Sequence, residues 1–95
     1  MKLLYFAWLR QHVGLSEETV DCPAGIGTVA ELMAWLATRS PGHAKAFEHP
    51  SRIKCAINQE HVRHDARVSA GDEIAFFPPV TGGWVVLYTP PSLPE

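Results

Sequence analysis

The two most apolar segments of this 95-residue chain lie near its opposite ends, at residues 2–9 (KLLYFAWL) and 73–77 (EIAFF). Each is short and rich in aromatic or branched side chains, which is typical of buried β-strands. A chain of this length forms one small hydrophobic core. We therefore expect the first and the last strand to lie side by side at the middle of a single sheet.

A strong helix signal separates these two segments. Thr28 and Glu31 have the spacing of a capping box, in which the hydroxyl and the carboxylate bind backbone N–H groups of the first helical turn. Four apolar residues follow at intervals of three and four positions: Val29, Leu32, Met33 and Leu36. Ser40-Pro41-Gly42 ends the pattern. The spacing predicts a helix with one apolar face that lies across the sheet.

Weaker signals predict four more elements: a strand at residues 18–22, a helical turn at 43–49, a strand at 52–57 and a short return strand at 61–63. In the last strand, Ile74 and Phe76 are expected on one face and Ala75 and Phe77 on the other. The resulting order of strands around one main helix predicts an α+β fold with a mixed sheet and the helix packed on one face. This is the β-grasp, or ubiquitin-like, layout.

Composition and charge exclude several classes of protein. A formal net charge of −2 without a basic stripe argues against nucleic acid or an anionic membrane as a partner. Cys22 and Cys55 form no C-x-x-C pair, so we expect two reduced cysteines and no zinc ribbon. The apolar stretch near the N-terminus is too short to span a membrane and lacks a cleavage site, so a cytoplasmic location is expected.

No self-contained active site is visible in the sequence. His61 and His64, with Asp65 beside them, are spaced along a short strand and turn, where they do not converge as they would on a helix. We expect a solvated loop there and no metal site. Motifs for hydrolases, metalloproteases and phosphate binding are absent. Any chemistry must come from the C-terminal tail or from a partner.

The tail contains a rigid Pro78-Pro79 pair followed by Gly82-Gly83. A glycine pair can form a hairpin turn, and the apolar residues 84–88 could then supply a second strand. It can also form a slim extended tail, since glycine lacks a Cβ and fits a tunnel too narrow for side chains. Two prolines before it would stiffen the exit and reduce the entropy lost when the tail docks.

Three blocks of the chain resemble the ubiquitin-like family of small, sulfur-carrier subunits of molybdopterin synthase. They are Leu4-Tyr5-Phe6-Ala7 with Arg10 and Gly14, Ala56-Ile57-Asn58-Gln59, and above all residues 71–83 (GDEIAFFPPVTGG). The resemblance covers residues 1–83, which it marks as a sulfur-carrier domain. Residues 84–95 would be a C-terminal extension. The resemblance favours an extended, threading tail at Gly82-Gly83 over a hairpin turn there.

The resemblance implies a function and its site. Gly83 would be adenylated by an ATP-dependent adenylyltransferase and then converted to a thiocarboxylate, which donates sulfur to cyclic pyranopterin monophosphate inside the large subunit. Gly82, Thr81 and Val80 would thread into that subunit. The carrier itself would bind no cofactor, because ATP is used by the activating enzyme. The chain alone would not be catalytic.

The same resemblance implies a surface for the large subunit around the exit of the tail. Phe6, Phe77, Pro78 and Pro79 would form an apolar patch there. His61 would lie at its edge, where the family commonly has an apolar residue. A different interpretation is that both phenylalanine rings belong to the hydrophobic core.

Residues 84–95 depart from the family, in which the chain ends at the second glycine. Three accounts are open: a protease removes the extension, the extension blocks function, or Trp84 to Tyr88 add a strand to a plain binding module. Two alternative functions also stay open, a sulfur carrier for thiazole or another product, and a non-catalytic β-grasp interaction module. The Pro-Pro pair argues against the thiazole carrier.

Overall fold

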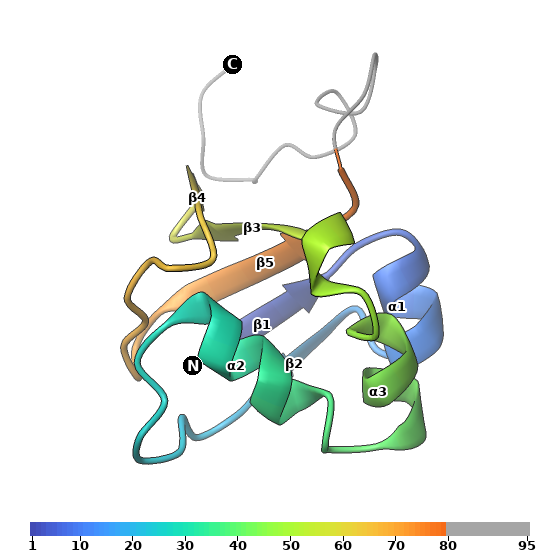
Figure 1. Cartoon of the computed structure of the whole chain (residues 1–95), viewed down its shortest axis with the longest axis horizontal. Coiled ribbons are helices and arrows are strands. Elements are labelled where there is room, and N and C mark those ends of the chain that lie inside the picture. The colour runs from blue at the N-terminus through green and yellow to red at the C-terminus, as the bar shows by residue number, and fades with distance from the viewer. Residues whose placement is uncertain (80–95) are drawn as a thin grey trace.

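The computed structural model describes residues 1–79 (Figure 1). One mixed sheet contains five strands: β1 (Lys2–Tyr5), β2 (Glu17–Thr19), β3 (Lys54–Ile57), β4 (Glu60–Val62) and β5 (Glu73–Phe77). The helical elements are α1 (Trp8–Val13), α2 (Val29–Leu36), α3 (Pro41–Ala46) and the 3-10 helix η1 (Pro50–Arg52). The strand order across the sheet is β2-β1-β5-β3-β4.

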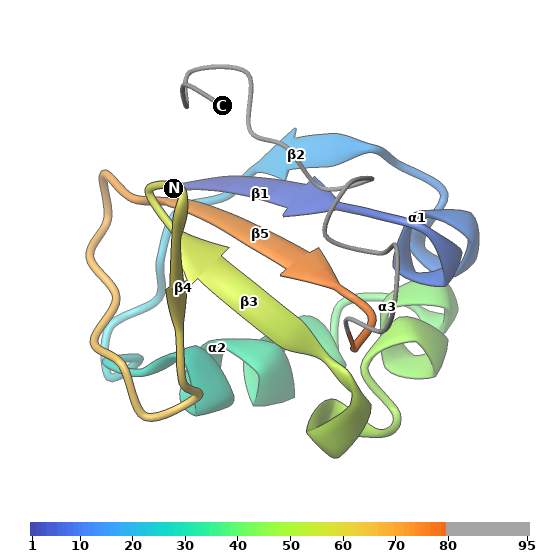
Figure 2. The ribbon, with the colours of Figure 1, turned by 90° about the horizontal axis from the view of Figure 1, so that it is seen from above.

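The two most apolar strands lie at the centre of the sheet, as the sequence predicts. β1 and β5 run parallel, with Leu3 opposite Ile74 and Tyr5 opposite Phe76, and the other neighbouring pairs are antiparallel. Helices α2 and α3 lie on one face of the sheet (Figure 2). Ile74 and Phe76 point to the main core, whereas Ala75 and Phe77 belong to a second cluster on the other face. The predicted β-grasp layout is confirmed.

Helix α2 begins where the capping box predicts. Thr28 Oγ1 accepts a hydrogen bond from the Glu31 backbone N–H at 3.2 Å, and Glu31 Oε1 accepts one from the Thr28 N–H at 3.1 Å. The four apolar residues of the predicted stripe are all buried. Their burial against the sheet supplies most of the stability of so short a helix.

The prediction of one strand over residues 2–9 is wrong in its second half. β1 ends at Tyr5, Ala7 turns the chain with a φ of 56°, and α1 begins at Trp8. Leu9 is fully buried, but it reaches the core from this helix. A continuous apolar run indicates burial without distinguishing a strand from a buried helical turn. The hydrophobic pattern therefore could not predict the change of direction at Ala7.

A network of polar side chains joins β1, β2 and α3 beside the main core. The Tyr5 hydroxyl donates to Glu18 Oε2 at 2.6 Å, and His43 Nε2 lies 2.7 Å from the same oxygen. Ser40, the N-cap of α3, accepts from the His43 backbone N–H at 3.1 Å, and its Oγ lies 2.8 Å from His43 Nδ1. Arg39 Nη2 lies 3.7 Å from Glu18 Oε1. Glu18 thus connects the edge strand β2 to the helical layer.

The network sets the protonation of Glu18. Burial by itself would raise the pKa of this carboxyl, but hydrogen bonds from Tyr5 and His43, with electrostatic attraction to His43 and Arg39, hold its pKa below the usual value. A carboxyl whose pKa is lower in the folded state stabilises the fold above its unfolded pKa, about 4.3 for Glu. That stability is lost as the pH falls through the lower, folded-state pKa.

We expect Glu18→Gln to lower the melting temperature at pH 7 by roughly 5–10 °C, since a hydrogen bond to a charged group contributes about 1.5–3 kcal/mol. The difference from the unchanged protein should shrink as the pH falls below about 4.3 and through the lower folded-state pKa of Glu18, because the carboxylate becomes protonated there. Thermal denaturation from pH 7 through this range measures both. Glu17→Gln is the matched control, since Glu17 has only a 3.9 Å surface ion pair with Lys2. An equal fall in melting temperature for Glu17→Gln would contradict the role of Glu18. So would a difference between Glu18→Gln and the unchanged protein that persists at low pH.

Candidate functional site

The C-terminal tail leaves the fold from the end of a central strand. At that end of β5, Phe76 is paired with Tyr5 on β1, and Phe77 with Lys54 on β3. Pro78 follows and is buried, whereas Pro79 is exposed. Proline has no N–H group and a fixed φ, so sheet pairing stops here and the exit is stiff. The base of the tail is therefore held by strands on both sides.

Apolar side chains gather beside this exit, on the face of the sheet opposite α2 and α3. Five residues form what we call the exit cluster: Leu4, Phe6, Ala56, Ala75 and Phe77. Phe6 continues the line of β1, and its backbone N–H donates to the Phe76 carbonyl at 3.1 Å. The His61 ring, on the edge strand β4, lies with its centroid 5.3 Å from that of Phe77. The cluster thus combines residues from β1 and its extension, β3 and β5, and His61 of β4 lies beside it.

The structure brings together the predicted partner-binding residues Phe6, Phe77 and His61 at the end of the sheet where Pro78 and Pro79 leave it. Phe77 is 0% exposed, as the core interpretation expects, whereas Phe6 is only partly buried. Phe77 therefore has a part in the stability of the fold. The predicted carrier residue Gly83, and the threading residues Val80, Thr81 and Gly82, lie outside the described residues.

His61 and His64 do not converge on one site. His61 faces the exit cluster, while His64 Nε2 lies 2.7 Å from the Ile53 carbonyl oxygen and is held there. Within residues 1–79, no group of three or more His, Cys, Asp or Glu side chains is placed to hold a metal ion. Cys22 and Cys55 are both free thiols, as predicted. No helix in the same range is long and apolar enough to cross a membrane.

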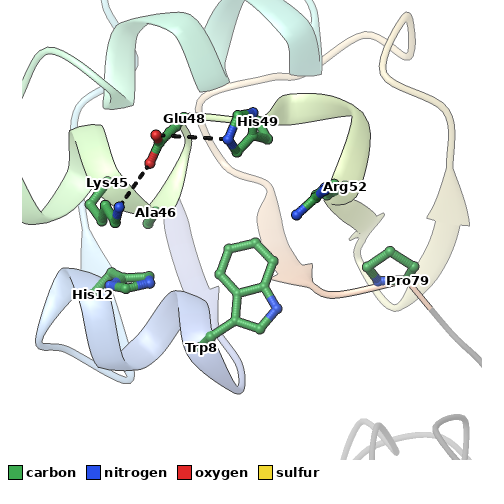
Figure 3. Close-up of a pocket in the computed structure, with 8 residues that line it drawn as sticks. All are labelled: Trp8, His12, Lys45, Ala46, Glu48, His49, Arg52 and Pro79. Carbon is green, nitrogen blue, oxygen red and sulfur yellow. Dashed lines mark ion pairs between the residues drawn. The ribbon is translucent and has the colours of Figure 1, made fainter.

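A pocket of about 500 Å³ lies on the other side of the exit, where Pro79 forms part of its rim (Figure 3). Its lining comes from α1, α3, the segment between α3 and η1, η1 itself and the tail: Trp8, His12, Lys45, Ala46, Glu48, His49, Arg52 and Pro79. Sequence reasoning missed this pocket. Its residues are spread from position 8 to position 79, and the apolar run at residues 2–9 predicts a strand at Trp8, so no local pattern reveals the pocket.

A family model described as the ThiS family matches residues 3–83, ending at the second glycine of the tail. The chain belongs to the ThiS family. It is 40% identical over 83 residues to the molybdopterin synthase sulfur carrier subunit of Escherichia coli, which covers 87% of this chain and 99% of that protein. The human molybdopterin synthase sulfur carrier subunit is 34% identical over 86 residues, and the match covers 87% of this chain and 93% of the human protein.

A solved structure agrees with the fold. The small archaeal modifier protein 1 of Haloferax volcanii superimposes with a TM-score of 0.65 at 29% identity, over 84% of this chain and 97% of that one. The family resemblance predicted from three sequence blocks is confirmed. Residues 84–95 lie beyond the match to the ThiS family.

Proposed function

We propose that this ThiS-family protein is the sulfur-carrier subunit of a molybdopterin synthase and carries sulfur as a thiocarboxylate on Gly83. The proposal rests on the family match, which ends at Gly83, together with the similarity to molybdopterin synthase sulfur carrier subunits over 93% and 99% of their length. The placement of the tail supports it, since Pro78 and Pro79 leave a central strand four residues before that glycine.

The chemistry requires a free carboxylate at Gly83. A carboxylate is a poor electrophile, so an activating enzyme must first join it to the α-phosphorus of ATP, with pyrophosphate as the leaving group. A sulfur nucleophile then attacks the carbonyl of the acyl-adenylate and AMP leaves. The thiocarboxylate gives its sulfur to cyclic pyranopterin monophosphate in the large subunit. In this scheme ATP belongs to the activating enzyme and the carrier binds no cofactor.

The exit cluster is the proposed contact with the large subunit. It lies next to the base of the tail, so a partner that receives the tail also meets Phe6 and His61. An apolar centre with a polar edge is the usual anatomy of a stable interface. The activating enzyme would approach the same tail. Activation of the tail and transfer of its sulfur are both expected in the cytoplasm.

Reconstitution tests the proposal. The chain ending at Gly83 is charged with sulfur by an activating enzyme and mixed with a molybdopterin synthase large subunit and cyclic pyranopterin monophosphate. Molybdopterin should form, and the carrier should return to its carboxylate form. A charged carrier that supports a thiazole synthase instead would favour the other sulfur-carrier function. A chain that is never charged would favour a non-catalytic interaction module.

A further inference from the structure

The pocket beside Pro79 has walls that are held in place by close packing of α1 against α3. A Cβ atom added at Gly42, in α3, would lie only 2.3 Å from the carbonyl oxygen of His12, in α1. The two helices therefore approach as closely as their backbones allow. Trp8 packs partly against the main core, and its ring makes an edge contact with His12, with centroids 6.1 Å apart. The aromatic wall of the pocket is thus fixed before any ligand arrives.

Within residues 1–79, the charges around the pocket leave one guanidinium without a partner. Lys45 Nζ lies 3.3 Å from Glu48 Oε1, and His49 Nε2 lies 3.7 Å from Glu48 Oε2, so the one carboxylate of the lining is already engaged. Arg52 has no ion-pair or hydrogen-bond partner for its side chain among residues 1–79. Arg39, by contrast, has both Glu18 and the Trp35 ring. Among the described lining residues, Lys45 and Arg52 outnumber the single carboxylate, and the N–H donors of Arg52 are unused within residues 1–79.

The Arg52 side chain is directed across the pocket toward the Trp8 ring (Figure 3). An aromatic face together with a guanidinium matches a ligand with a planar ring and an anionic group. Guanidinium N–H groups fit the oxygens of a phosphate, and indole rings stack on heterocycles. A volume of about 500 Å³ is in the range of sites for small molecules. His12 and His49 each add a ring N–H or acceptor in any protonation state.

We propose that this pocket binds a small planar heteroaromatic molecule that carries a phosphate, with the ring against Trp8 and the phosphate on Arg52. The inference does not rest on the proposed function, since it concerns binding by the carrier chain alone. It places a ligand at the base of the tail, on the side of the exit opposite the exit cluster. A bound ligand there would contact Pro79.

The test uses the full chain, residues 1–95, labelled with 15N and titrated with adenosine 5′-monophosphate as the probe. We expect saturable shifts of the Trp8 indole N–H and of backbone amides in α1 and η1. Adenosine, which lacks the phosphate, and inorganic phosphate, which lacks the ring, should each bind at least about tenfold more weakly, a difference of roughly 1.4 kcal/mol. Comparable binding of phosphate alone would overturn the role of the ring.

Two substitutions make the test specific. Arg52→Gln should weaken binding of the probe at least about fivefold, an effect of roughly 1 kcal/mol. Arg63→Gln removes the same charge at an exposed position after β4, outside this pocket, and should leave binding unchanged. Equal losses in both variants would indicate general charge attraction and overturn the site, as would shifts centred away from Trp8. Failure of sulfur transfer in reconstitution would leave this binding result unaffected, so the two proposals fail separately.

Discussion

A chain that ends at Gly83 is expected to accept sulfur from an activating enzyme, ATP and a sulfur source, whereas the chain of residues 1–95 is not. In the longer chain a peptide bond joins Gly83 to Trp84, so Gly83 has no carboxylate to adenylate. The proposed threading also requires a tail without bulky side chains at this point, and an indole would not meet that requirement. Intact mass spectrometry measures the result as the mass gained when sulfur replaces one oxygen. We expect near-complete conversion of the short chain and none of the long chain.

A chain ending at Trp84 separates the two causes. It has a free carboxylate, but the carboxylate follows an indole instead of two glycines. If the absence of a carboxylate at Gly83 were the sole obstacle, this chain would still be adenylated at its new terminus. We expect it to stay uncharged. Thermal denaturation of residues 1–83 should show a cooperative transition, which confirms that the truncated chain is folded.

The same experiment, repeated with a protease that removes the extension, separates two of the accounts of residues 84–95. Charging of the long chain only after a protease has removed the extension supports a precursor. Loss of charging without any removal supports a blocking extension. Equal charging of both chains without cleavage, or no charging of a folded short chain, would defeat the assignment of Gly83 as the sulfur carrier.

The second large effect is expected in the exit cluster. Phe6→Ala should weaken binding to the large subunit by about 2 kcal/mol, or roughly thirtyfold, because an apolar anchor near the centre of an interface contributes that much. Phe77→Ala should weaken binding too, but it should also lower stability by about 3–5 kcal/mol, since the ring is fully buried. Titration calorimetry and thermal denaturation of each variant measure the two effects.

Leu15→Ala is the matched control for the exit cluster. Leu15 is 45% exposed in the turn between α1 and β2, and it belongs to neither cluster of apolar side chains. Its truncation should change neither affinity nor stability by more than about 0.5 kcal/mol. An unchanged affinity of Phe6→Ala would remove this residue from the interface. If the loss of affinity in Phe77→Ala is fully explained by the fraction of the variant that is unfolded, the Phe77 ring belongs to the core alone.

Short-range patterns predicted much of the fold and part of the candidate site. The capping box at Thr28 and Glu31 places the start of α2, because both hydrogen bonds join residues three positions apart. Alternation in β5 separates Phe76 from Phe77, because successive side chains of a strand point to opposite faces. The block at residues 71–83 predicted the family, and with it the proposed carrier residue. Each of these inferences depends on neighbours in the chain.

Contacts between distant residues were set by the packing of the whole fold. The apolar side chains of Trp8 and Leu9 are compatible with a strand or with a helix. The turn at Ala7 places both residues in a helix. Glu18 meets His43 across twenty-five positions, and Trp8 faces Arg52 across still more, so neither pairing has a local signature. Such contacts exist because the sheet and its helices pack in one arrangement. The amino-acid sequence by itself determined which segments are buried and where the tail begins, and packing determined which polar groups meet around them.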